Sequence, residues 1–186
     1  MENMFWIGLM GALVALSFAW VQRGKVMRAS EGDEKMVKIA AAIRSGANAY
    51  LKRQYTTVGK VFVVVFLLLL AIAFLSGGAM LSRITPFAFV TGGVFSMLAG
   101  FIGMKIATNA NARTANAAHE SLNHGLKVAF SSGSVMGFTV VGLGVLDITL
   151  WFLGLKYIGK MDAVQIANVM VMNGMGASFM ALFARV

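Results

Sequence analysis

The chain has 186 residues, of which 59% are hydrophobic and only 12% are charged, and its mean hydropathy is +0.79. Soluble domains carry about a quarter of charged residues, so this composition excludes a soluble fold and indicates an integral membrane protein. The net charge of +9 therefore reports which loops face the cytoplasm rather than binding to nucleic acid.

A single proline and the lack of regular alternating segments favour helices over a barrel. The predicted fold class is all-α, a polytopic membrane helical bundle that forms one domain with about five transmembrane helices. The chain contains no cysteine, which excludes disulfides and thiolate metal sites.

Residues 5–21 form the first predicted span, an apolar run of about the minimum length for crossing a membrane. Glu2 precedes it, whereas Arg23, Lys25 and Arg28 follow it, which is the reverse of a signal peptide. This charge pattern predicts an uncleaved helix with the N-terminus outside. A loose match to a signal-peptidase site near its end leaves cleavage as the alternative.

Residues 22–60 form a basic segment that we place in the cytoplasm. Gly32 and Asp33 predict a turn or a helix N-cap. From Glu34 onwards, apolar residues recur at spacings of three and four, which indicates an amphipathic helix. This helix either lies along the membrane face or extends the next span, 61–80, into the cytoplasm. Phosphate binding by its basic residues is the alternative to plain positive-inside charge.

Span 61–80 consists largely of bulky apolar residues, so we expect it at the lipid-facing periphery. Close helix packing in membranes needs small residues, and spans 87–106 and 134–155 carry them at spacings of four. These two spans are therefore predicted to pack inward. The alanine-rich segment 107–127 between them predicts cytoplasmic extensions of both helices, joined near residues 121–125.

The segment 107–127 is unusually rich in hydrogen-bonding side chains, including Asn109 and Arg113. Packing against neighbouring cytoplasmic helices explains them most simply, and contact with a ligand is the alternative. Nine basic residues in 22–60 and three between 105 and 127 face the cytoplasm, against three outside. This asymmetry predicts five spans with the N-terminus outside, the last being 163–186.

One apparent metal motif is incomplete. His119 and Glu120 begin like a zinc-protease helix, but Asn123 stands where the second histidine is required, and His124 comes one residue late. Phosphate-loop, nucleophile-elbow and dinucleotide motifs do not occur in the sequence. We therefore expect no metal site and no catalytic residue in this chain.

Two ionisable residues lie inside predicted spans. Asp147 lies in the middle of 134–155, where an ionisable group indicates function by default, but its apolar neighbours favour a structural role. Arg185 ends a face of small residues on 163–186 that includes Ser178. An arginine that faces a bundle interior needs carboxylate partners, and we expect these on helices that follow in the chain.

Three motifs resemble one protein family. The segments IRSGANAYLKRQY at 43–55, GMKIATNANARTA at 103–115 and ALFARV at 181–186 are similar to segments of membrane-integral, ion-pumping pyrophosphatases. They occur in the same order as in that family, and the resemblance covers essentially the whole chain. It implies a longer homodimeric protein that hydrolyses magnesium pyrophosphate at the cytoplasmic face and moves H⁺ or Na⁺ outward.

The resemblance also implies roles for single residues. Arg185 matches the arginine of the family's ion gate, and Ser178 matches a small polar residue that lines the gate. The ligands for pyrophosphate and Mg²⁺, with K⁺ as a further cofactor, are implied to lie after residue 186, so this chain alone is expected to be inactive. Asp147 matches no family motif. In a prokaryote the protein would lie in the plasma membrane, surrounded by lipid.

A different class of function stays open at this point. A small five-span channel, transporter subunit or membrane assembly factor, complete at 186 residues, fits the same composition and charge pattern. The reading frame after Val186 separates the two hypotheses. A continuation with many more spans supports the pump, and a stop codon supports the small protein.

Overall fold

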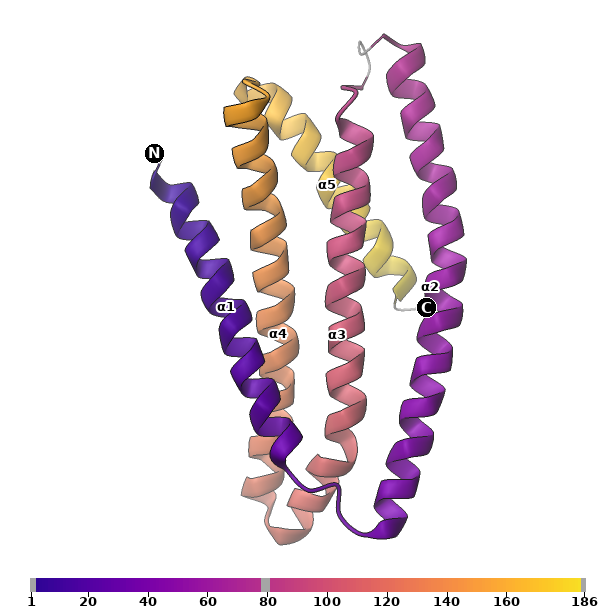
Figure 1. The fold of residues 1–186 in the computed structure, drawn as a ribbon, viewed down its shortest axis with the longest axis vertical. Helices are drawn as coiled ribbons and strands as arrows, with labels where there is room; N and C mark the ends of the chain where they lie inside the picture. The colour runs from indigo at the N-terminus through magenta and orange to yellow at the C-terminus, as the bar shows by residue number, and fades with distance from the viewer. Residues whose placement is uncertain (1–2, 78–80, 185–186) are drawn as a thin grey trace.

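The computed structural model describes residues 3–77 and 81–184, and these residues form helices without any strand (Figure 1). The helices are α1 (Asn3–Arg28), α2 (Glu34–Leu75), α3 (Thr85–Glu120), α4 (Leu122–Leu153), the π-helical turn η1 (Gly154–Ile158) and α5 (Ala163–Ala184). The predicted all-α bundle is therefore confirmed.

Four stretches of the described chain are long and apolar enough to cross a membrane. They are Trp6–Arg28, Glu34–Leu75, Thr85–Glu120 and Leu122–Ile158. Helix α5 is apolar but also carries several amides, and the predicted fifth span, 163–186, stays a prediction.

The helices form a bundle in which α4 lies between α1 and α3, and α2 lies on the other side of α3 (Figure 1). Helix α5 starts beside the end of α4, crosses α3 obliquely and ends against α2, part-way along that helix. Helix α5 therefore packs mainly on α3, which is itself in direct contact with α4 and α2.

Helix α2 is a single helix of 42 residues. The Asp33 carboxylate caps it by accepting a hydrogen bond of 2.8 Å from the backbone N–H of Met36, as the sequence predicts. Because the helix continues without a break to Leu75, the amphipathic segment extends the second span and does not lie along the membrane. Most of the large apolar side chains of α2 are exposed, as expected for a lipid-facing helix.

Helices α3 and α4 are joined by one residue, Ser121. Its hydroxyl caps α4 by accepting a hydrogen bond of 3.1 Å from the backbone N–H of His124. Both helices extend far beyond the length of a membrane span and meet within the predicted interval 121–125.

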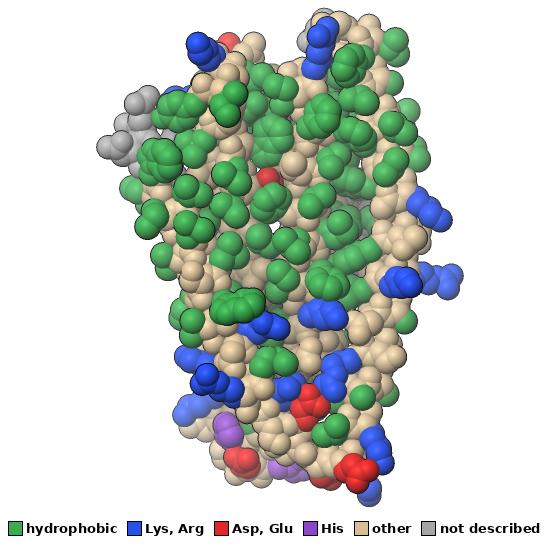
Figure 2. Space-filling model, in the orientation of Figure 1, with side chains coloured by type: hydrophobic (Ala, Val, Ile, Leu, Met, Phe, Trp, Pro, Cys, Tyr) green, Lys and Arg blue, Asp and Glu red, His purple; other side chains and the backbone are tan. Residues whose placement is uncertain are grey.

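Most of the charged side chains gather at one end of the bundle, which we call the basic end. On the face shown in Figure 2, apolar side chains cover most of the length, and Lys, Arg, Asp, Glu and His collect where α1 ends, α2 begins and α3 meets α4. This distribution is the one that a membrane boundary near the basic end imposes on a helical bundle.

Two glycines allow α3 and α5 to cross in close contact. A side chain at Gly176 would collide with the backbone carbonyl of Phe89, and one at Gly92 would collide with the carbonyl of Asn173. Small residues that permit backbone approach are the usual basis of helix association in membranes. The crossing is therefore fixed by both glycines, one on each helix.

We predict that Gly176→Ala destabilises the protein by about 1 to 3 kcal/mol, the usual cost of forcing extra atoms into a packed contact. Gly174→Ala is the matched control, because a methyl group at Gly174 meets no atom within 4 Å. The fraction of protein that stays monodisperse in detergent after heating measures the difference. Equal heat resistance of the two variants would contradict the close crossing.

Candidate functional site: a polar cluster between α3, α4 and α5

Asp147 is the buried acid of the bundle, with 5% of its surface exposed. Helix α4 directs it toward α5, where its carboxylate accepts a hydrogen bond of 3.0 Å from the side-chain amide of Asn173. Asn173 is equally buried, at 4%. An ionisable group inside a membrane is costly without a partner, and Asn173 supplies that partner from another helix.

The Asn173 amide also binds α3. Its nitrogen lies 3.2 Å from the carbonyl oxygen of Ala88 and 3.4 Å from the hydroxyl of Thr91. The indole N–H of Trp151, on α4, donates to the same hydroxyl at 2.6 Å. One amide therefore connects three helices.

Asp147 also lines a cavity of about 480 Å³. Its walls come from α2, α3, α4 and α5 and are largely apolar, with Gln54 and Tyr55 as polar members. The small residues Ala177 and Ala181 of α5 face this space. The carboxylate thus lies between a hydrogen-bonded contact and an open volume within the bundle.

The residues predicted for the ion gate lie on the same helix. Ser178 is exposed on α5, one position after the cavity-lining Ala177. Arg185 lies outside the described residues. Ser178 therefore lies further along α5 than the polar cluster. Among the described residues it has no hydrogen-bond partner there.

A second cluster lies at the basic end, around Glu31 in the connection between α1 and α2. The Arg113 guanidinium, on α3, lies 2.8 Å from the Glu31 carboxylate and donates to the carbonyl oxygen of Ala29 at 3.0 Å. Arg44, on α2, donates to both oxygens of the same carboxylate at 2.8 and 3.2 Å. One carboxylate therefore holds α2 and α3 to the connection between α1 and α2.

The two arginines change the acidity of Glu31. The hydrogen bond from Arg44 is the main cause that lowers the pKa of Glu31, and the charge of Arg113 adds to it, while burial acts in the opposite direction. The carboxylate form is favoured by these contacts.

Asn109 lies one helical turn before Arg113 on α3. Its side-chain amide donates to the backbone carbonyl oxygen of Lys105 at 2.8 Å. Its backbone carbonyl oxygen accepts a hydrogen bond from the Arg113 guanidinium at 2.6 Å. Both residues predicted in the polar segment thus have contacts within the protein. The contacts of Arg113 with Glu31 and Ala29 fit the packing explanation given for the segment, whereas the hydrogen bonds of Asn109 stay within α3.

Comparison with known proteins adds the decisive observation. The sequence model of the family described as inorganic H⁺ pyrophosphatase matches residues 13–186. The chain belongs to this family. The resemblance carried by the three sequence motifs is therefore confirmed.

Several curated relatives of this chain are named as pumps. A putative K⁺-stimulated pyrophosphate-energized sodium pump of Bacteroides thetaiotaomicron is 49% identical over 98% of the chain and 26% of the relative. A K⁺-insensitive pyrophosphate-energized proton pump of Moorella thermoacetica is 40% identical over 94% and 24%. A K⁺-stimulated sodium pump of Thermotoga maritima is 37% identical over 94% and 25%. The chain thus spans about a quarter of the length of these relatives.

Sequence reasoning missed the partners in both clusters. Asn173 could have been suspected, because it and Asp147 lie roughly two to three helical turns from the same α4–α5 connection. Glu31 carried no comparable signal, since a loop acid among many basic residues has several candidate partners.

We predict that Asn173→Leu destabilises the protein by about 1 to 2 kcal/mol, the upper range for hydrogen bonds between helices in membranes. Asp147→Asn should be mild, because an amide oxygen still accepts the bond from Asn173. The control is Asn168→Leu, the same change at an exposed position of α5. Heat stability in detergent distinguishes these variants. If Asn173→Leu is as stable as wild type, the hydrogen bonds of Asn173 do not stabilise the fold.

Glu31 makes stability depend on pH. Its pKa is lower in the folded protein, so its contribution is complete above its unfolded pKa of about 4.3 and is lost as the pH falls through the lower folded value. Glu31→Gln should therefore reduce heat stability at pH 7, and its difference from wild type should shrink as the pH approaches 3.

Glu34→Gln is the control for this experiment, because the Glu34 side chain is 83% exposed and pairs only with Lys38 on the same helix. Exposed pairs of this kind contribute little. A loss in the Glu31 variant that stays constant from pH 7 to pH 3 would show that the charge of Glu31 is not what stabilises this end.

Proposed function

We propose that this chain forms the N-terminal part of a membrane pyrophosphatase that couples hydrolysis of magnesium pyrophosphate to outward pumping of H⁺ or Na⁺. The family match over residues 13–186 is the observation that carries the proposal. Relatives named as sodium pumps and as proton pumps both match, so the proposal includes either ion. The same match disfavours a small channel, transporter subunit or assembly factor.

Hydrolysis is assigned to parts of the longer pump outside this chain. Within residues 3–77 and 81–184, no group of three or more His, Cys, Asp or Glu side chains could hold a metal ion. The proposal places the ligands of Mg²⁺ and pyrophosphate in the rest of the pump. K⁺ is a second cofactor to test, because some relatives are named as K⁺-stimulated.

The contribution of this chain is to position the ion gate. In the proposal, Arg185 and Ser178 belong to the gate and are carried by α5. The contact of Asn173 with Asp147 and with α3 holds this helix in place. An arginine keeps its charge throughout the cycle, so exchange of its carboxylate partners could bias where a cation lies.

The setting of the pump completes the proposal. We propose a homodimer in the lipid bilayer, with the N-terminus outside and the basic end in the cytoplasm, and in a prokaryote the plasma membrane as its location. The excess of Lys and Arg at the basic end supports this orientation.

The test is the full-length pump reconstituted in vesicles and supplied with magnesium pyrophosphate. Wild type should release phosphate and accumulate H⁺ or Na⁺, whereas Arg185→Ala should lose about tenfold or more of both activities, equivalent to about 1.4 kcal/mol or more of lost stabilisation. Arg83→Ala is the control, because Arg83 contacts the Phe74 ring. Both residues lie at the end of the bundle away from the basic end.

Two results would contradict parts of this proposal separately. Normal coupled pumping by Arg185→Ala would overturn the gate assignment. Robust hydrolysis by the 186-residue chain alone would overturn the assignment of the hydrolytic site to the rest of the pump.

A further inference from the structure

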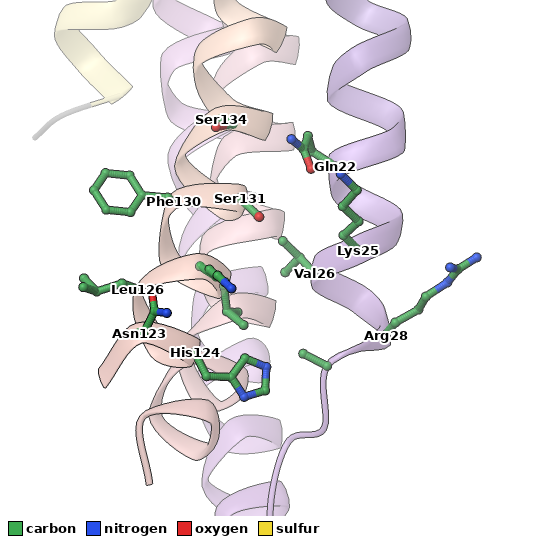
Figure 3. Close-up of a pocket in the computed structure, with 13 residues that line it drawn as sticks. Gln22, Lys25, Val26, Arg28, Asn123, His124, Leu126, Phe130, Ser131 and Ser134 are labelled. Atoms are coloured by element: carbon green, nitrogen blue, oxygen red, sulfur yellow. The ribbon is translucent and has the colours of Figure 1, made fainter. Parts of the chain in front are cut away.

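A pocket of about 780 Å³ lies between the end of α1 and the beginning of α4, at the basic end (Figure 3). Gln22, Lys25 and Val26 project from α1 on the side of α4, and Ser131 turns toward them from α4. Lys127 also lines the pocket. Arg28 and His124 line it as well, so the pocket combines several cationic or basic side chains with amides, hydroxyls and apolar walls.

The lysines of this pocket have no counter-charge within the described chain. Neither Lys25 nor Lys127 forms an ion pair among the described residues, and no acid lines the pocket. The acids of the basic end all have other partners: Glu31, Asp33, Glu34 and Glu120. Both lysines are exposed, so what balances their charge lies outside the described residues: the surrounding solvent, the rest of the longer protein, or an anion that binds in the pocket.

Gln22 adds a second, independent observation. Its side-chain oxygen is buried, and among the described residues it has no hydrogen-bond partner. Buried polar atoms are normally paired, and an unpaired one costs about 1 to 3 kcal/mol. A polar ligand in the pocket would allow this amide to turn and form a hydrogen bond.

The position of the pocket indicates which anion it takes. Trp20 on α1 is 71% exposed, and the Arg23 guanidinium lies 5.0 Å from the centre of its ring. An exposed tryptophan beside a cation is typical of the boundary between lipid and water. At the edge of the pocket, its lining residues Leu126 and Phe130 point out from α4 and present apolar surface. A molecule with a charged head and apolar tails fits both features.

We propose that this pocket binds the headgroup of an anionic phospholipid. The phosphate lies between Lys25 and Lys127, Ser131 and Gln22 form hydrogen bonds with the headgroup, and the acyl chains run along the apolar surfaces of α1 and α4. Basic pockets between membrane helices are known to bind such headgroups. The inference is independent of pyrophosphate chemistry, since it requires no residue of the gate.

Native mass spectrometry of the purified full-length protein tests this site, with phosphatidylglycerol as the probe and phosphatidylcholine as the neutral lipid. Wild type should prefer phosphatidylglycerol, and the double variant Lys25→Gln/Lys127→Gln should bind it about thirtyfold more weakly, as expected from about 1 kcal/mol per lysine. Lys52→Gln/Lys60→Gln, two exposed lysines of α2 outside the pocket, should stay within about twofold of wild type.

Three results would overturn the proposal. Equal loss in both double variants would indicate general attraction to positive charge. Displacement of phosphatidylglycerol by millimolar inorganic phosphate would indicate a site for soluble anions. If wild type binds phosphatidylglycerol no more tightly than phosphatidylcholine, the pocket does not recognise a negatively charged headgroup.

A labelling experiment on the unmodified protein covers the case in which the lysine variant does not fold. Photoactivatable phosphatidylglycerol should crosslink to peptides that contain residues 22–29 and 123–134. Crosslinks confined to other peptides would overturn the site.

Discussion

The close crossing of α3 and α5 is the contact on which the polar cluster around Asp147 depends. Gly92 and Gly176 remove the side chains that would separate the two backbones. The short distance then brings the Asn173 amide within reach of α3 and of Asp147 on α4. Without that approach the carboxyl group would face apolar side chains, which is unfavourable in a membrane. The glycines permit the close approach of the two helices. The hydrogen bonds of Asn173 then fix how α5 is oriented against α3 and α4.

The sequence predicts the elements of this bundle well, because each is specified locally. The Asp33 cap, the joint at Ser121 and the outward position of α2 follow from short patterns of residue type. The partner of Asp147 does not follow, since it depends on how α4 and α5 tilt and rotate against each other. Hydropathy is nearly uniform around these helices, so it does not select the facing side. Arg185, on which the gate hypothesis depends, lies outside the described residues.

The two clusters show different solutions to the same electrostatic problem. Within the bundle, Asp147 is stabilised by a neutral amide, which adds no further charge to the apolar region. At the basic end, the single negative charge of Glu31 pairs with two arginines, so it has no further contact to offer to other cations. Positive charge therefore remains in excess at this end. That excess is what leaves the lysines between α1 and α4 without partners. The clamp around Glu31 and the proposed lipid site are thus linked through the small number of acids.

The unbroken length of α2 has a consequence for how this family can vary. Arg44 reaches the Glu31 carboxylate near one end of the helix, and Phe62 stacks on Phe89 of α3 with 4.8 Å between ring centres. The two positions are about five complete helical turns apart, so both side chains point to the same side. Insertion of one residue between them would turn one contact away from α3 by about 100°. Changes of length between related chains should therefore accumulate in the connections outside α2, and this stretch should keep a constant residue count.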